Sequence, residues 1–166
     1  MNQNEFRDLV ERLSEMPEIV RRLIDGLAVE DLRRKPSEKE FSMLENVCHL
    51  RDIEEEGYSM RIQKLINESR PFLPDLDGGK LARERDYNAQ DLAAALRDFA
   101  RARHSNMQTI RALPLEQLNR HGMFENTGTI TLEKLLLLMN EHDEEHQKEM
   151  SDLRRTTARP EELRIL

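Results

Sequence analysis

The fold is decided by residues 131–153, TLEKLLLLMNEHDEEHQKEMSDL. Leucine and methionine recur there at steps of three and four residues, which places them on one face of an amphipathic helix. Thr131 stands directly before the first leucine, where its side chain can cap the helix N-terminus. His142 and His146 occupy positions on the same apolar face. The stretch therefore predicts a core helix that carries two imidazoles on its packed side.

Three more stretches have the apolar periodicity of a helix. They cover approximately residues 5–27, 42–70 and 88–113. Pro17 lies inside the first and is expected to kink or restart it. The second begins with a capping box formed by Ser42 and Glu45, and its apolar residues spread over more than one face, so we expect contacts on two sides. No segment alternates like a β-strand. The 166 residues are sized for one domain, so residues 1–166 are predicted to form a single all-α four-helix bundle.

Residues 68–88, between the second and third helices, have no apolar periodicity. The segment contains two prolines and two adjacent glycines. A loop of this length inside a compact domain is often functional or mobile. A simple crossover between two helices is an equally good interpretation.

The composition excludes several classes of protein. The net charge is −7 and the pI is about 5.4, so a nucleic-acid or anionic-membrane binder is not expected. The longest aliphatic run, residues 135–139, is far shorter than the roughly 20 residues of a membrane span. The opening residues lack a signal-peptide pattern, and Cys48 is the single cysteine. We therefore expect a cytoplasmic protein. Charged runs such as residues 54–56 are expected on solvated faces.

His142 and His146 are four residues apart, so both imidazoles can reach one metal ion. A buried imidazole is costly unless it is hydrogen-bonded or coordinated, and simple hydrogen bonding is the alternative for this pair. His49, on the second helix, taken alone fits a hydrogen-bonded residue at a helix interface. Two antiparallel helices could nevertheless bring it opposite the pair. The combination predicts a metal site made of His49, His142 and His146.

Other interpretations of the titratable residues are weaker. Residues 142–146 match the zinc-protease string H-x-x-E-H, but no histidine follows His146 to supply a third ligand. A di-iron carboxylate bundle requires glutamates on all four helices, and the third helix has none. His104 is expected in solvent, His121 in a loop that could line a cleft over the metal, and Cys48 in the core.

Two stretches resemble the DinB-like family of bacterial proteins. Residues 41–55, FSMLENVCHLRDIEE, are similar to the family element in which an aromatic–serine pair opens a helix that carries a histidine and then an acidic cluster. Phe41 stands where the family usually has tryptophan. Residues 128–146, GTITLEKLLLLMNEHDEEH, resemble the glycine, threonine–leucine and H-x3-H element. Tyr87 and Asp91 also occur in the expected order, and the likeness covers most of the chain.

The resemblance implies an up-down-down-up bundle with a long crossover, and one divalent nickel, zinc or iron ion on His49, His142 and His146. It also implies a homodimer. Some relatives are thiol S-transferases that use bacillithiol or mycothiol, so the first functional expectation is a metal-dependent transferase acting on a small thiol and an electrophile in stress or detoxification. The alternative is a non-catalytic metal-binding or stress-induced interaction protein. An open coordination position facing a ligand-sized cleft would favour the enzyme.

Overall fold

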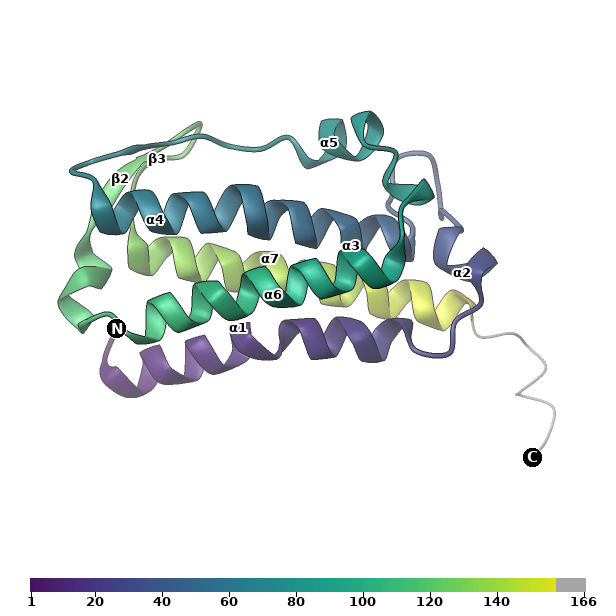
Figure 1. Cartoon of the computed structure of the whole chain (residues 1–166), viewed down its shortest axis with the longest axis horizontal. Coiled ribbons are helices and arrows are strands. Elements are labelled where there is room, and N and C mark those ends of the chain that lie inside the picture. Colours follow the sequence, from purple (N-terminus) through teal and green to yellow (C-terminus); the bar gives the residue numbers. More distant parts are fainter. Residues whose placement is uncertain (158–166) are drawn as a thin grey trace.

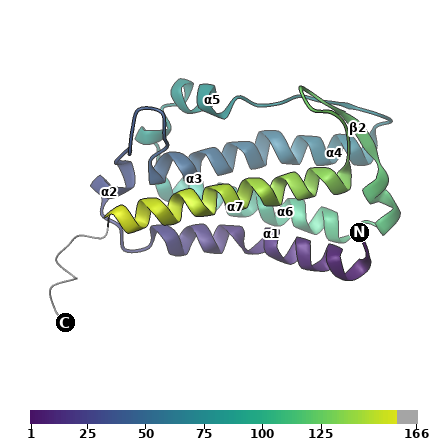
Figure 2. The ribbon, with the colours of Figure 1, turned by 180° about the vertical axis from the view of Figure 1, so that it is seen from behind.

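The computed structural model describes residues 1–157, and four long helical segments form its bundle (Figures 1 and 2). The segments are α1 (Gln3–Ile24), the continuous run of α3 (Met43–Asp52), η1 (Ile53–Tyr58) and α4 (Ser59–Asn67), then α6 (Leu92–Arg111) and α7 (Leu132–Thr157). In Figure 1, α1 and α7 run in one direction while α3–α4 and α6 run in the other. This is the expected up-down-down-up bundle, with a crossover along its length between α4 and α6.

Short elements occupy the connections. They are α2 (Val29–Arg33), α5 (Gly78–Glu84), η2 (Tyr87–Ala89) and η3 (Leu115–Asn119), with strands β1 (Phe72–Leu73), β2 (His121–Phe124) and β3 (Gly128–Thr131). β2 pairs with β1 in parallel and with β3 antiparallel, in a small sheet beside the start of α7. The expectation of no β-structure is therefore wrong. Strands of two to four residues are too short to show alternation. The crossover is not a bare loop either, because it contains β1, α5 and η2.

The helix starts follow from their capping residues. Ser42 and Glu45 form the expected capping box, with Glu45 N donating to Ser42 Oγ at 3.1 Å and Ser42 N donating to Glu45 Oε2 at 2.8 Å. Asp91 caps α6, and Thr131 accepts from the backbone of Lys134 at the start of α7. None of the helices in the described residues is long and apolar enough to cross a membrane.

Pro17 neither stops nor restarts α1, which is one helix from Gln3 to Ile24. Proline has no N–H, so the carbonyl oxygen of Leu13, four residues earlier, lacks its helical donor. Arg103 Nη1, on α6, donates to that oxygen at 2.7 Å. The side chain of a neighbouring helix thus satisfies the group that the proline leaves free.

A polar layer divides the core into two apolar clusters. One cluster contains Leu13, Met107 and Met139, and the other contains Met16, Phe99 and Met150. Along α6 the change between clusters occurs at Arg103, and along α7 it occurs at residues 142–146. The three candidate ligands therefore lie at the middle of the bundle. There α3–η1, α6 and α7 supply polar side chains, and α1 supplies a backbone carbonyl.

Glu54 corrects the expectation that residues 54–56 are a solvated face. Its side chain is 1% exposed, and its Oε2 lies 2.9 Å from Arg103 Nη2. Arg103 also pairs with both carboxylate oxygens of Asp143 on α7, at 2.6 and 2.9 Å. Asn106 completes the group by donating to Glu54 Oε1 at 2.7 Å. The buried guanidinium of Arg103, on α6, thus contacts α1, η1 and α7.

Candidate metal centre

His49 is placed by a helix that is covered on two sides. All residues from Ser42 to Leu50 are buried, because the bundle covers one side of α3 and the crossover covers the other. This confirms the expected contacts on two sides of the second helix. His49, two turns beyond its N-cap, is 8% exposed, and the Phe41 ring lies 5.2 Å from its imidazole.

The structure brings His49, His142 and His146 into one cluster, with ligand atoms within 4.8 Å of one another. His49 Nε2 and His142 Nε2 are 3.1 Å apart. Two nitrogens that bind the same ion at about 2 Å lie roughly 3 Å from each other. The ring centroid of His146 lies 4.7 Å from that of His49 and 4.5 Å from that of His142.

Asn46 fixes the tautomer of His146. The Asn46 amide nitrogen donates to the carbonyl oxygen of Ser42, so its Oδ1 faces His146 Nδ1, at 2.7 Å. Because an amide oxygen only accepts, Nδ1 carries the proton and Nε2 keeps its lone pair. Metal-binding histidines are commonly oriented by such a bond on the second ring nitrogen. His146 is thereby prepared to bind through Nε2.

The donor set fits a divalent transition metal. Neutral imidazole suits nickel, zinc and iron, and three such ligands leave positions for another molecule. The Nδ1 atoms of His49 and His142 are buried without a hydrogen-bond partner among the described residues. The Nε2 atoms of the two rings are within hydrogen-bond distance of each other, so ordinary hydrogen bonding satisfies at most one nitrogen of each ring and leaves both Nδ1 atoms unpaired.

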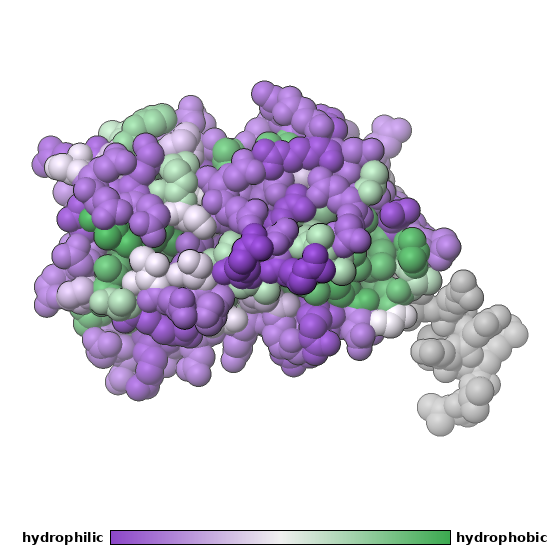
Figure 3. Space-filling model, in the orientation of Figure 1, coloured by the Kyte–Doolittle hydropathy of each residue, from purple (hydrophilic) through white to green (hydrophobic). Residues whose placement is uncertain are grey.

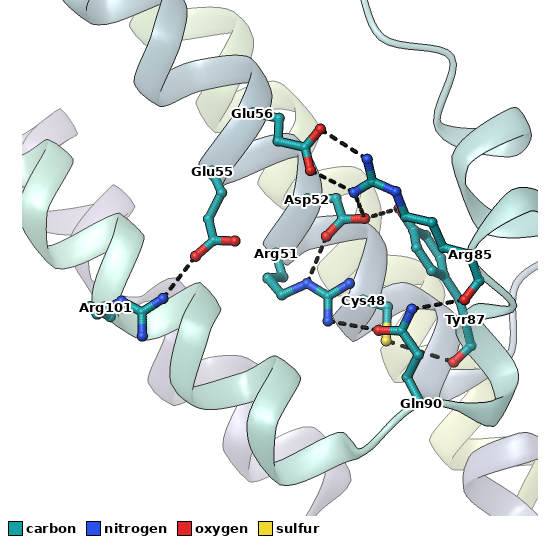
Figure 4. Close-up of polar contacts among 9 residues, drawn as sticks. All are labelled: Cys48, Arg51, Asp52, Glu55, Glu56, Arg85, Tyr87, Gln90 and Arg101. Atoms are coloured by element: carbon teal, nitrogen blue, oxygen red, sulfur yellow. Dashed lines mark hydrogen bonds and ion pairs between the residues drawn. The ribbon is translucent and has the colours of Figure 1, made fainter.

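The crossover is attached to α3 at Asp52 (Figure 4). This buried carboxylate accepts from Tyr87 Oη at 2.6 Å and from Arg85 Nη1 at 2.7 Å, while Arg51 Nε donates to its other oxygen at 2.6 Å. Burial raises the pKa of Asp52, but the hydrogen bonds from Arg51 and Tyr87 outweigh it and keep the pKa below its usual value. Arg85 also pairs with Glu56. These contacts hold α5 and η2 against the helix of His49.

Gly78, the first residue of α5, packs directly on the His49 ring. A Cβ atom at this position would lie 2.3 Å from His49 Cε1 and 2.6 Å from Nδ1, closer than van der Waals contact allows. The absence of a side chain therefore permits the crossover to cover the ring. The crossover therefore covers the candidate site at Gly78. The sequence alone did not show whether residues 68–88 have a functional role or only connect two helices.

We expect Gly78→Ala to weaken metal binding by roughly tenfold, the lower end of the effect of removing support around a ligand. The added methyl group must displace either the His49 ring or α5. Gly79→Ala is a matched control, because a Cβ there meets its nearest neighbours at 3.5 Å, an ordinary contact. The measurement is competition of each variant with a metal indicator. Equal affinities for the two variants would show that Gly78 does not position His49.

Burial lowers the pKa of His49 to about 4 and that of His142 to about 2, with repulsion by the neighbouring His146 as the next cause. Both rings are therefore neutral, the form that binds metal, at physiological pH. Protons compete with a metal for these rings only in distinctly acidic solution.

These pKa values predict how the stability of the metal-free protein depends on pH. Below about pH 6.5 the unfolded chain protonates both imidazoles and the folded chain does not. Stability should fall as the pH drops from about 6.5 toward 4, by up to roughly 2.7 kcal/mol per pH unit for two protons. Above this range the two rings should contribute no pH dependence. Urea unfolding of metal-free protein measures the slope, and a His49→Gln/His142→Gln variant with an undiminished slope would contradict the prediction.

The other sequence candidates lie outside the cluster. His104 is exposed on α6, as expected. His121 belongs to β2, not to a loop, and it is exposed and does not line the cavity beside the three histidines. Cys48 is fully buried, and burial raises the pKa of its thiol to about 11, which confirms a core position. Sequence reasoning missed Arg103, Asp143 and Glu54, since nothing in a charged run marks which member is buried.

The chain matches a known protein family along most of its length. A family model described as the DinB superfamily matches residues 12–150. The chain belongs to the DinB superfamily. None of the curated proteins compared with it matches significantly. Among solved structures, this DinB protein is similar to YfiT from Bacillus subtilis, described as a probable metal-dependent hydrolase with an unusual four-helix bundle topology. The TM-score is 0.87 at 19% identity, over 94% of this chain and 89% of YfiT, so the likeness establishes the fold.

Proposed function

We propose that His49, His142 and His146 hold one divalent metal ion, and that this protein is a metal-dependent transferase for a low-molecular-weight thiol of the bacillithiol or mycothiol type. The observation that carries the proposal is a cavity of about 440 Å³ lined by all three histidines. A ligand-sized cavity at the ligand atoms distinguishes an enzyme from a protein in which a metal only stabilises the bundle.

The residues around the cavity have separable roles. Asn46 orients His146, and Gly78 allows the crossover to cover His49. Apolar side chains, including Ile53, Leu76 and Leu138, line part of the cavity. When bound, a divalent ion lowers the pKa of a thiol or water molecule that reaches its open positions. The neutral rings of His49, which is buried, and His142, which is half-buried, keep the site ready for such an ion over a wide pH range.

A second candidate is metal-dependent hydrolysis, in which water replaces the thiol as nucleophile. The description of YfiT as a probable metal-dependent hydrolase favours it. The two reactions require the same three histidines and the same cavity. They differ in the molecule that the nucleophile attacks. For the transferase it is an electrophile that accepts the thiol, and for the hydrolase it is an ester or amide that water cleaves.

The test is a substrate screen with protein loaded with zinc, nickel or iron(II). Bacillithiol, mycothiol and glutathione are each combined with electrophiles such as alkyl halides and epoxides, while esters and amides are offered without a thiol. The transferase predicts metal-dependent consumption of one thiol that disappears in His142→Ala. Hydrolysis of esters or amides without any thiol turnover would contradict it in favour of the second candidate. Tight metal binding with no turnover in either arm would favour the non-catalytic alternative.

We also infer a homodimer in a reducing cytoplasm, acting in stress or detoxification. Support for the dimer comes from the family alone, because the apolar faces of α3 are covered within one chain. The face in Figure 3 is largely hydrophilic, and the large exposed hydrophobic residues among those described are Val29, Phe72 and Met123. Sedimentation equilibrium at micromolar concentration should give twice the 19.6 kDa of one chain. A mass near that of one chain would reject the dimer.

A further inference from the structure

Arg61, on α4, is a buried cation without a full counter-ion. Its side chain is 4% exposed, and its guanidinium carbon lies 4.6 Å from the centre of the Phe124 ring. Nε and Nη2 both donate to the carbonyl oxygen of Pro74, at 3.0 and 2.8 Å. The nearest carboxylate, Asp75, contacts Nη2 at 3.3 Å but is itself 51% exposed. The guanidinium is therefore fixed in place while its charge is balanced only weakly.

Arg103 provides an internal comparison. It is equally buried, but two buried carboxylates, Glu54 and Asp143, lie 2.9 and 2.6 Å from its nitrogens. Burial alone would lower the pKa of both arginines. The two carboxylates reverse this effect at Arg103, whose pKa is raised, whereas Asp75 does not reverse it at Arg61, whose pKa is lowered. A buried charge normally has a partner, so Arg61 lacks a full counter-ion among the described residues.

Arg61 lines the same cavity as the three histidines. Arg61 Nη1 has no hydrogen-bond acceptor among the described residues, nor does the hydroxyl group of Tyr58, which also lines the cavity. Tyr58 lies between the two ends, with its ring centre 6.0 Å from that of His142 and 5.8 Å from the Arg61 guanidinium carbon. Arg61 and Tyr58 thus line one space whose other end is formed by the histidines.

We propose that Arg61 and Tyr58 bind the oxyanion, a carboxylate or a phosphate, of a small substrate whose reacting group lies at the histidines. The inference rests on the proposed function, because the histidine end of the cavity is its metal site. Guanidinium and phenol groups donate to oxyanions, and an ionised acceptor makes these hydrogen bonds stronger. Glu141 and Glu145 also line the cavity, but both are exposed to water. Together with Asp75 they disfavour polyanions, so the site selects a ligand with one anionic group and an apolar body.

The test is calorimetric titration of metal-free protein with benzoate and phenyl phosphate, and with benzyl alcohol as the neutral analogue. Metal-free protein is used because an anion could otherwise bind the ion directly. Wild type should bind at least one anion saturably, and Arg61→Gln should bind it at least about tenfold more weakly. Tyr58→Phe, which removes only the hydroxyl group, should weaken binding by a smaller factor. Arg97→Gln, which removes an exposed charge on α6, should bind as wild type does.

Equal affinity of wild type and Arg61→Gln, or no saturable binding of either anion by wild type, would overturn the proposal. If Arg61→Gln does not fold, Tyr58→Phe decides, and an unchanged affinity for the anion overturns the proposal. A parallel zinc titration of wild type separates this inference from the metal site. Zinc binding without anion binding rejects the oxyanion site alone. Anion binding without zinc binding supports the oxyanion site and rejects the metal site.

Discussion

Replacing Arg103 with methionine should lower the free energy of unfolding by about 3–5 kcal/mol, the usual result of removing one partner from a buried ion pair. The substitution leaves Glu54 and Asp143 buried without their cation, and it also removes the donor to Leu13 O. A typical domain is stable by only about 5–15 kcal/mol, so the variant should be close to unfolding in cells. Urea denaturation of metal-free protein measures the difference.

Arg101→Met is the matched control, on the same helix two residues earlier. Arg101 is 69% exposed and pairs with Glu55 and Asp98 at the surface, as Figure 4 shows for Glu55. Exposed pairs contribute about 0–1 kcal/mol, so this variant should be nearly as stable as wild type. A triple variant, Glu54→Gln/Arg103→Met/Asp143→Asn, should recover much of the loss because no unpaired charge remains. Equal small losses for Arg101→Met and Arg103→Met would show that the polar layer does not stabilise the bundle.

Replacing His146 with alanine should abolish the effect of chelators on thermal stability. Metal that binds only the folded state adds about 2.7 kcal/mol at a concentration 100 times Kd. For a chain of this size, that is a change in Tm of roughly 5–10 °C. Wild type should therefore lose about this much when chelator is added at neutral pH, and His146→Ala should lose nothing. Differential scanning calorimetry with and without chelator makes the comparison.

His104→Ala is the control for this experiment, since His104 is an exposed histidine on α6. It should respond to chelator as wild type does. Circular dichroism should show that His146→Ala keeps its helical content, because the apolar residues of α7 remain in both clusters. The same chelator response in wild type and His146→Ala would mean that the histidines are ordinary polar residues of the core.

The fold could be predicted from the sequence where one helix face is apolar. The stripes of α1, α6 and α7 have the period of the helix, and Ser42 and Thr131 mark starts that the structure confirms. The third helix begins at Leu92, capped by Asp91, and not near residue 88 as predicted. The meeting of His49 with His142 and His146 required the order of the helices in space, which periodicity does not contain. The family resemblance supplied that order.

The remaining features depend on contacts between segments far apart in the sequence. Glu54 is indistinguishable from Glu55 and Glu56 in sequence, yet only Glu54 turns toward Arg103. Gly78 lies in a segment without periodicity, and its contact with His49 depends on how the crossover folds back over α3. Nothing in the sequence distinguishes Arg61 from an exposed charge, yet its side chain is buried, and the one carboxylate paired with it among the described residues is exposed. Each case is a tertiary contact that no local pattern predicts.

The most direct test of the central claim combines metal analysis with X-ray absorption spectroscopy. Metal-free protein is titrated with zinc, nickel and iron(II), and the loaded protein is examined for its ligands. We predict one tightly bound ion per chain, with three imidazole nitrogens in the coordination sphere at about 2 Å. The His49→Ala/His142→Ala/His146→Ala variant should bind none with comparable affinity. No tight binding of any of the three metals by wild type, or equal binding by the triple variant, would contradict the account.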